Sequence, residues 1–201
     1  MTAQRPRRWI AGAALASAAL LAGCGNVDAG SGARDAFIAY MADVPGVTGA
    51  DASMSNDLPF RGSGDFEVEL DASSDEKTLD AALDHAAAFP VPSGVSVDLL
   101  KTSISTPAID IGIDTLWGSE TSGIAERALA LTRIPDLTSY VEELDGVYHA
   151  DPELTISIDV SPIAPDPCVI AAAVAQATGT SVADIQVHGW KDQNVAELTC
   201  G

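Results

Sequence analysis

The sequence has few basic residues. Its 201 residues include 10 Lys+Arg against 29 Asp+Glu, which gives a formal net charge of −19 at pH 7. Affinity for nucleic acids depends on Lys and Arg side chains that displace counterions from phosphates, so nucleic acid is excluded as a partner. The acidic residues do not indicate a disordered tail either. Hydrophobic residues make up 47% of the chain, and the length is sufficient for a sizeable core.

Aromatic residues and catalytic motifs are also scarce. Phe, Trp and Tyr make up only 5% of the chain, so we expect a core of Val, Ile, Leu and Ala. The sequence contains no G-x-S-x-G, H-E-x-x-H, P-loop or G-x-G-x-x-G motif. The three histidines, His85, His149 and His188, are far apart in the sequence. We therefore predict no catalytic residue, no cofactor and no metal site. A hydrolase with a site built from dispersed residues is the enzymatic alternative.

No apolar run is long enough to span a bilayer, which takes about 20 residues. The longest, Trp9 to Leu21, has roughly a dozen, and it follows Arg5, Arg7 and Arg8. This order of basic and apolar segments is typical of a signal peptide. The segment Leu21-Ala22-Gly23-Cys24 that ends it resembles the lipobox of bacterial lipoprotein precursors.

The resemblance covers only this leader, and it implies that residues 1–23 are removed and that the Cys24 thiol carries diacylglycerol. The protein would then be anchored by lipid to the cell membrane on its extracytoplasmic face. An ordinary secreted protein, with Cys24 as a spare thiol or disulfide partner, is the alternative. Without the leader the chain keeps 7 basic residues against 29 acidic ones, a charge of −22. Residues 24–32 are small and polar and predict a flexible tether.

The rest of the chain matches itself when shifted by 90 positions without a gap. Phe66, Val68 and Leu70 then fall on Ile156, Ile158 and Val160. We predict two α+β units, over residues 33–102 and 103–201. Two unrelated stretches that happen to be in phase are the alternative.

Each unit is expected to begin with a helix that ends at a proline, Pro45 or Pro135. A strand, an alternating strand, a second helix and a closing strand follow. The stripe of the second helix is expected at Leu79, Ala82, Leu83 and Ala86 in the first unit. In the second unit it is expected at Val169, Ala172, Ala173 and Gln176. One further strand, over Ile104–Ile113, completes a βαββαβ order. This order resembles the ferredoxin-like split βαβ sandwich, so the predicted fold class is α+β, with tandem antiparallel sheets.

Two cysteines remain once Cys24 is assigned to lipid. Disulfides persist in exported proteins, and the tail after His188 is long enough to return to the start of the second helix. We predict a disulfide between Cys168 and Cys200, with two reduced thiols as the alternative.

Acidic side chains are the remaining candidates for a functional surface. Asp65, Glu67, Glu69 and Asp71 alternate with apolar residues, so they should share one face of a strand. This face is either an acidic docking surface or an ordinary solvated face. Asp136, Glu142, Glu143 and Asp145 are expected to add solvated charge near the second unit's hairpin.

Taken together, the sequence predicts a membrane-anchored, non-catalytic interaction or envelope-assembly module whose partner is an envelope protein. The alternative is a lipoprotein that binds a cation or small solute in a groove between the units. Such a groove would bring His and Asp side chains together with Trp117 or Trp190.

Overall fold

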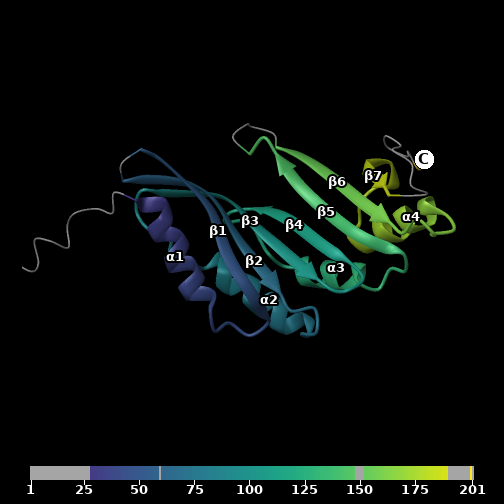
Figure 1. Ribbon diagram of the computed structural model, residues 1–201, viewed down its shortest axis with the longest axis horizontal. Helices are drawn as coiled ribbons and strands as arrows, with labels where there is room; N and C mark the ends of the chain where they lie inside the picture. The colour runs from purple at the N-terminus through teal and green to yellow at the C-terminus, as the bar shows by residue number, and fades with distance from the viewer. Residues whose placement is uncertain (1–27, 59, 148–151, 190–199, 201) are drawn as a thin grey trace, which may run out of the picture.

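The computed structural model describes residues 28–58, 60–147, 152–189 and 200. They form one seven-stranded sheet and four α-helices (Figure 1). The strands are β1 (Val47–Leu58), β2 (Arg61–Leu70), β3 (Val95–Ser105), β4 (Asp110–Leu116), β5 (Leu137–Asp145), β6 (Glu153–Val160) and β7 (Ile185–His188). The helices are α1 (Ala29–Met41), α2 (Glu76–Ala87), α3 (Ile124–Leu131) and α4 (Pro167–Thr178), and a short 3₁₀ turn, Val182–Asp184, precedes β7.

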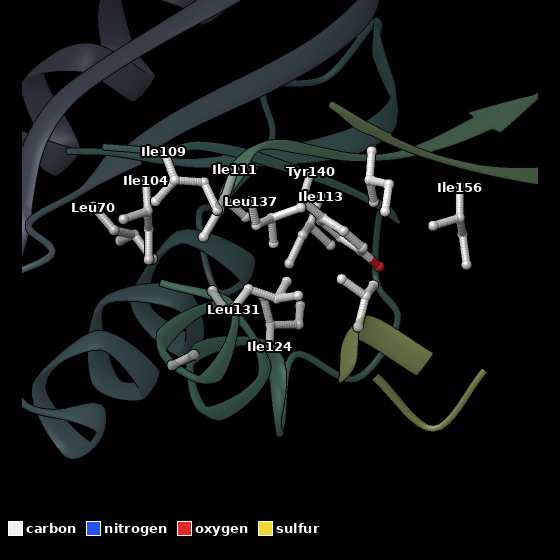
Figure 2. Close-up of a cluster of buried hydrophobic side chains, with 14 of the residues drawn as sticks. Leu70, Ile104, Ile109, Ile111, Ile113, Ile124, Leu131, Leu137, Tyr140 and Ile156 are labelled. Carbon is white, nitrogen blue, oxygen red and sulfur yellow. The ribbon is translucent and has the colours of Figure 1, made fainter. Parts of the chain in front are cut away.

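The core lies on one side of the sheet. Buried residues alternate along the strands, as at Phe66, Val68 and Leu70 of β2, and the helices bury their apolar stripes against them. Figure 2 shows Ile109, Ile111 and Ile113 extending from the sheet toward Ile124 and Leu131 of α3. The first unit adds an aromatic group, in which the Phe37 and Phe66 rings stack with centroids 4.1 Å apart. The other side of the sheet has no covering helix among the described residues.

The strands pair in chain order, from β1 to β7. Antiparallel pairs (β1 with β2, β3 with β4, β5 with β6) alternate with parallel pairs (β2 with β3, β4 with β5, β6 with β7). The sheet is therefore mixed, not antiparallel, and the expected tandem ferredoxin-like arrangement is not confirmed. In a split βαβ unit another strand separates the two parallel strands, whereas here the parallel strands joined by α2, α3 or α4 are direct neighbours.

The segment Ile104–Ile113, expected as one strand, is a hairpin. Thr106 N–H donates to the Ile109 carbonyl, and the Thr106 hydroxyl accepts from the backbone N–H groups of Ala108 and Ile109. This turn brings Ile104 of β3 opposite Ile111 of β4. The sequence Thr106-Pro107 explains the break, because proline has no N–H for a ladder and a threonine hydroxyl can close a local turn.

The spacing of 90 residues recurs in the backbone. The pairing of β1 with β2, including an irregularity between Val47 and Gly49, is repeated by β5 with β6 between Leu137 and Ser139. Asp71 N–H donates to the Gly46 carbonyl at 2.9 Å, and Ser161 N–H donates to the Asp136 carbonyl at 2.8 Å. Gly46 and Asp136 both have left-handed φ angles, of 83° and 62°. The two stretches therefore share a turn geometry that their sequence identity does not reveal.

Gly46 is the position where this turn most needs glycine. A Cβ there would lie 3.0 Å from Thr78 Cγ2, in addition to the strain of a left-handed φ. We expect Gly46→Ala to lower the free energy of unfolding by about 2 kcal/mol in urea denaturation. Gly118→Ala is the matched control, because its φ is similar at 81° but its Cβ would meet nothing within 4 Å. An equal loss in both variants would show that the contact with Thr78 adds nothing.

The predicted apolar stripe of the second helix is confirmed in α2 and wrong in α4. Leu79, Ala82, Leu83 and Ala86 are buried, but Val169 is 65% exposed. The buried side of α4 consists of Pro167, Ile170, Ala171, Val174 and Ala175. The cause is one additional residue between β6 and α4, because Asp166 caps α4 and Asp75 caps α2 at a spacing of 91. A register of 90 therefore fails for this helix.

The prediction of a flexible tether over residues 24–32 is wrong for residues 29–32. Helix α1 already begins at Ala29, and both Ala29 and Gly30 are buried. Gly30 N–H donates to Asn56 Oδ1 of β1 at 2.7 Å, which fixes the start of the helix on the sheet. Cys24 lies outside the described residues. None of the described helices is sufficiently long and apolar to cross a membrane.

Candidate functional site

The sheet face opposite the helices carries polar side chains from neighbouring strands. We call it the open face. Its members, all exposed or half-exposed, are Asp51, Ser53, Asp65, Glu67, Glu69, Lys101, Ser103, Asp114, Val141, Glu143, Ser157 and Asp159. They come from β1 to β6, and Gln186 and His188 of β7 extend the same face beside Ser157 and Asp159. The open face is therefore acidic and rich in serine.

Lys101 lies at the centre of the carboxylates. Direct strand pairing places Asp51 beside Glu67, Glu67 beside Lys101 and Lys101 beside Asp114. The Lys101 ammonium contacts Asp65 Oδ2 at 3.2 Å. Partial burial is the largest single influence on the pKa of Lys101 and lowers it, but the hydrogen bond to Asp65 and the charges of Asp65, Asp114 and Glu67 together raise it. Lys101 therefore stays charged and offsets part of the acidic charge around it.

Three of the four acidic residues predicted on one strand face lie on the open face: Asp65, Glu67 and Glu69. Asp71 follows the end of β2 and accepts hydrogen bonds from the N–H and the hydroxyl of Ser73, at 2.9 and 2.7 Å. The Ser73 hydroxyl and N–H lower the pKa of Asp71. Asp71 is thus part of the turn before α2, because a short acidic side chain readily bonds the backbone two residues on.

Asp114 is a partly buried carboxylate of the open face, and its pKa is raised. Partial burial raises its pKa, as do Glu143 and Asp65, while Lys101 and the Leu144 N–H lower it less. Because the pKa is higher in the folded than in the unfolded chain, the ionised carboxylate opposes folding. This cost grows as the pH rises above the unfolded-state pKa and is complete above the folded-state pKa. The protonated carboxyl is favoured at low pH.

We therefore expect Asp114→Asn to raise the free energy of unfolding at pH 7 by about 0.5 kcal/mol, a small value because the side chain is half-exposed. The gain should vanish near pH ~3, where the carboxyl is protonated in both states. Asp110→Asn, at an exposed position of the same strand, is the control. Denaturant unfolding at both pH values measures the difference, and a gain that persists at the lower pH contradicts the electrostatic cause.

Carboxylates of the open face do not converge on a cation. Within the described residues, no group of three or more His, Cys, Asp or Glu side chains has an arrangement that could hold a metal ion. The strands separate neighbouring carboxylates, and Lys101 occupies the space where several of them meet.

Two grooves lie between neighbouring helices, one in each predicted unit. The first, of about 750 Å³, lies between α1 and α2 and is lined by Tyr40, Asp43, Lys77, Thr78 and His85 among others. The second, of about 690 Å³, lies between α3 and α4. At the boundary between the units α2 packs on α3, and the Thr121 hydroxyl donates to Asp84 Oδ1 at 2.8 Å. This contact joins α2 and α3 where the groove between the units was expected.

The described histidines and Trp117 do not converge. His85 stacks on Tyr40 with ring centroids 4.1 Å apart, and His188 lies opposite Asp159 on the edge strand. Trp117 packs edge-on against Phe66 in the first unit. His149 and Trp190 lie outside the described residues. Each described member of this set therefore has a separate structural environment.

A buried charged cluster beneath the sheet was not foreseen. Glu142, expected as solvated charge, faces the core between Ile113 and Ile156 and is only 7% exposed. Its Oε2 lies 3.2 Å from Arg127 Nη2 and accepts from the Tyr140 hydroxyl at 3.3 Å. Burial, together with the negative charge of Glu142, strongly raises the pKa of Tyr140. The available signal was the strand period, which places Glu142 on the same side as Tyr140.

The predicted disulfide is confirmed. Cys168 and Cys200 are bonded, with Cα atoms 5.3 Å apart and a sequence separation of 32. Cys168 is the second residue of α4, and Cys200 is buried against the core. The bridge therefore attaches the end of the chain to the second unit.

The fold and its surfaces define a mixed α/β protein with a helix-covered core and an open acidic sheet face. In comparisons with known proteins, no family model, no curated protein and no solved structure matches this chain.

Proposed function

We propose that this chain is an extracytoplasmic lipoprotein, held on the cell membrane by diacylglycerol on Cys24, and that its α/β part is a non-catalytic docking module for an envelope protein. The location rests on Leu21-Ala22-Gly23-Cys24 and the basic and apolar segments before it. The observation that carries the docking role is the open face, which neighbouring strands build and no described helix covers.

Charge indicates what kind of partner fits the open face. Asp65, Glu67 and Asp114 surround a single lysine, so the surface potential there is negative. A protein surface with exposed Lys or Arg would be attracted to it and oriented by it, whereas an anionic surface would be repelled. The partner is therefore a protein with a basic docking surface.

Membrane attachment is tested by fractionation. Cys24→Ser should release the protein from the membrane or leave an uncut precursor, while the wild type stays in the membrane fraction. The lipid anchor would be contradicted if the wild type and the variant appeared in the same fraction and migrated identically in gel electrophoresis.

Docking is tested by photo-crosslinking on intact cells. A benzophenone amino acid at Val141, which is 39% exposed on the open face, should form a cross-link to one envelope protein. The same amino acid at Ala172, exposed on α4, is the control and should not. Adding Glu67→Lys should abolish the cross-link if basic residues of the partner recognise this surface. Cross-links that are equal at both positions, or unaffected by Glu67→Lys, would overturn the docking role.

A second candidate is capture of a small solute, which the groove between α1 and α2 favours. Its volume of about 750 Å³ suits a small molecule, and the Tyr40–His85 stack provides an aromatic wall beside Lys77. Native mass spectrometry of protein isolated with its membrane would show a bound molecule that His85→Ala loses. A protein free of small molecules in both forms would contradict this candidate.

A further inference from the structure

Three segments meet at one end of the first unit. They are the start of α1, the turn between β1 and β2, and the loop between α2 and β3. Gly62 of β2 lies so close to Gly30 of α1 that a Cβ at position 62 would be 2.7 Å from the Gly30 Cα. Gly62 N–H also donates to the Gly94 carbonyl in the α2–β3 loop at 3.0 Å. We call this junction the Phe60 end (Figure 1, where α1 begins beside the β1–β2 turn).

Phe60 is exposed at the tip of this end. Its residue surface is 51% accessible, and its backbone φ of 66° is left-handed, which is rare for a bulky side chain. The carbonyl of Phe60 packs against Gly94, where a Cβ would lie 2.4 Å away. Leu58 and Arg61 are paired, so Phe60 is a central residue of a two-residue turn, where a left-handed backbone is common. Here the packing holds an aromatic ring out in solvent.

The surface beside Phe60 is a shallow groove of about 680 Å³. It is lined by Ala29, Gly32, Ala33, Pro92, Ser93 and Gly94 in addition to Phe60. No Asp, Glu, Lys or Arg contributes to this lining, whereas Arg61, the next residue of the turn, is exposed. Asp28, directly before Ala29, is exposed too and offsets the charge of Arg61, so the match to a lipid interface rests on the apolar lining and the exposed Phe60 ring.

The length of chain before α1 determines what this end can reach. Only four residues separate Cys24 from Ala29, so the two Cα atoms lie at most about 18 Å apart even in a fully extended chain. This step rests on the proposed lipidation of Cys24. With the lipid in the bilayer, the start of α1 and the Phe60 beside it are held next to the head groups.

We infer that the Phe60 end lies on the membrane, with the Phe60 ring among the lipid head groups. The opposite end of α1 is about 20 Å away along the 13-residue helix. The exposed Ala42 at that end therefore serves as a reference position that faces away from the lipid.

The test uses the full lipidated protein, purified from membranes and reconstituted into vesicles of phosphatidylcholine and phosphatidylglycerol. Phe60→Cys, Ser93→Cys and Ala42→Cys each introduce one free thiol, because Cys168 and Cys200 are bonded. The thiol is labelled with the fluorophore NBD. Vesicle flotation measures attachment, and nitroxide lipids measure contact of the label with the bilayer.

We expect all three proteins to float with the vesicles. Labels at positions 60 and 93 should show blue-shifted emission and at least a twofold loss of intensity with nitroxide lipids, and the label at 42 should show neither. A floating protein in which the labels at 60 and 93 behave like that at 42 would overturn the inference and leave lipidation standing. Proteins that do not float would overturn lipidation and the inference together. The label at position 60 could instead show blue-shifted emission in detergent solution, to an extent that increases with protein concentration. This result would show that the Phe60 end contacts a second copy of the chain, and it would overturn membrane contact.

Discussion

Replacing Cys168 and Cys200 together by alanine is expected to lower the free energy of unfolding by about 3–4 kcal/mol. The bridge joins residues 32 positions apart, and closing a loop of this length removes that much conformational entropy from the unfolded chain. The loss should appear as a lower denaturant midpoint. The change also removes the covalent link between the start of α4 and the buried Cys200.

The reduced wild type is the control for this disulfide variant. Under a reductant it should unfold at the denaturant concentration of Cys168→Ala/Cys200→Ala, and the variant should not respond to the reductant. A wild-type protein whose midpoint is unchanged after both thiols become alkylatable would contradict a stabilising role for the bridge.

The second large effect is expected at the buried ion pair. Glu142→Gln should lower the free energy of unfolding by about 2–3 kcal/mol, because it leaves the partly buried Arg127 guanidinium without its counter-charge. Arg127 is 28% exposed, so water offsets part of the cost that a fully buried charge would carry. Its Nε is already buried without a hydrogen-bond partner in the described structure, which leaves the guanidinium dependent on Glu142.

Two further variants separate the pair from its individual charges. Arg127→Met combined with Glu142→Leu should recover part of the loss, since apolar side chains of similar volume often replace a buried pair at little cost. The recovery is incomplete because the buried Tyr140 hydroxyl loses its acceptor. Glu143→Gln, one residue along on the open face, should change stability by less than ~0.5 kcal/mol. A double variant as unstable as Glu142→Gln would show that the loss comes from packing and not from an unpaired charge.

The sequence predicted the elements that have one apolar face. The alternation of Phe66, Val68 and Leu70, and of Ile156, Ile158 and Val160, indicated half-buried strands, and all six residues are buried. The buried stripe of α2 was predicted, because Leu79, Ala82, Leu83 and Ala86 follow the helical period. The disulfide was predicted by cysteine count and the length of the tail.

Strand pairing could not be predicted in the same way. Apolar alternation shows which side of β2 is buried but not which strands lie beside it. The observed neighbours are β1, antiparallel, and β3, parallel. The stripe of α4 was missed because a single added residue before Asp166 shifts the register. Glu142 was missed because its counterpart 90 positions earlier is Ala52, a small apolar residue that gives no sign of a buried charge.

The open face combines a predicted and an unpredicted part. The period of β2 placed Asp65, Glu67 and Glu69 together, whereas the contribution of Asp114 and Lys101 follows from pairing across β3 and β4. A docking surface of this kind is distributed over strands that are distant in sequence, and only their register brings the side chains together.

Anchoring of this sheet on the membrane through Cys24 is measured by the mass of the N-terminal peptide of protein isolated from cells. We expect this peptide to begin at Cys24 and to carry the mass of a diacylglyceryl group. A mature chain with an unmodified Cys24, or one that begins at any other residue, would contradict it.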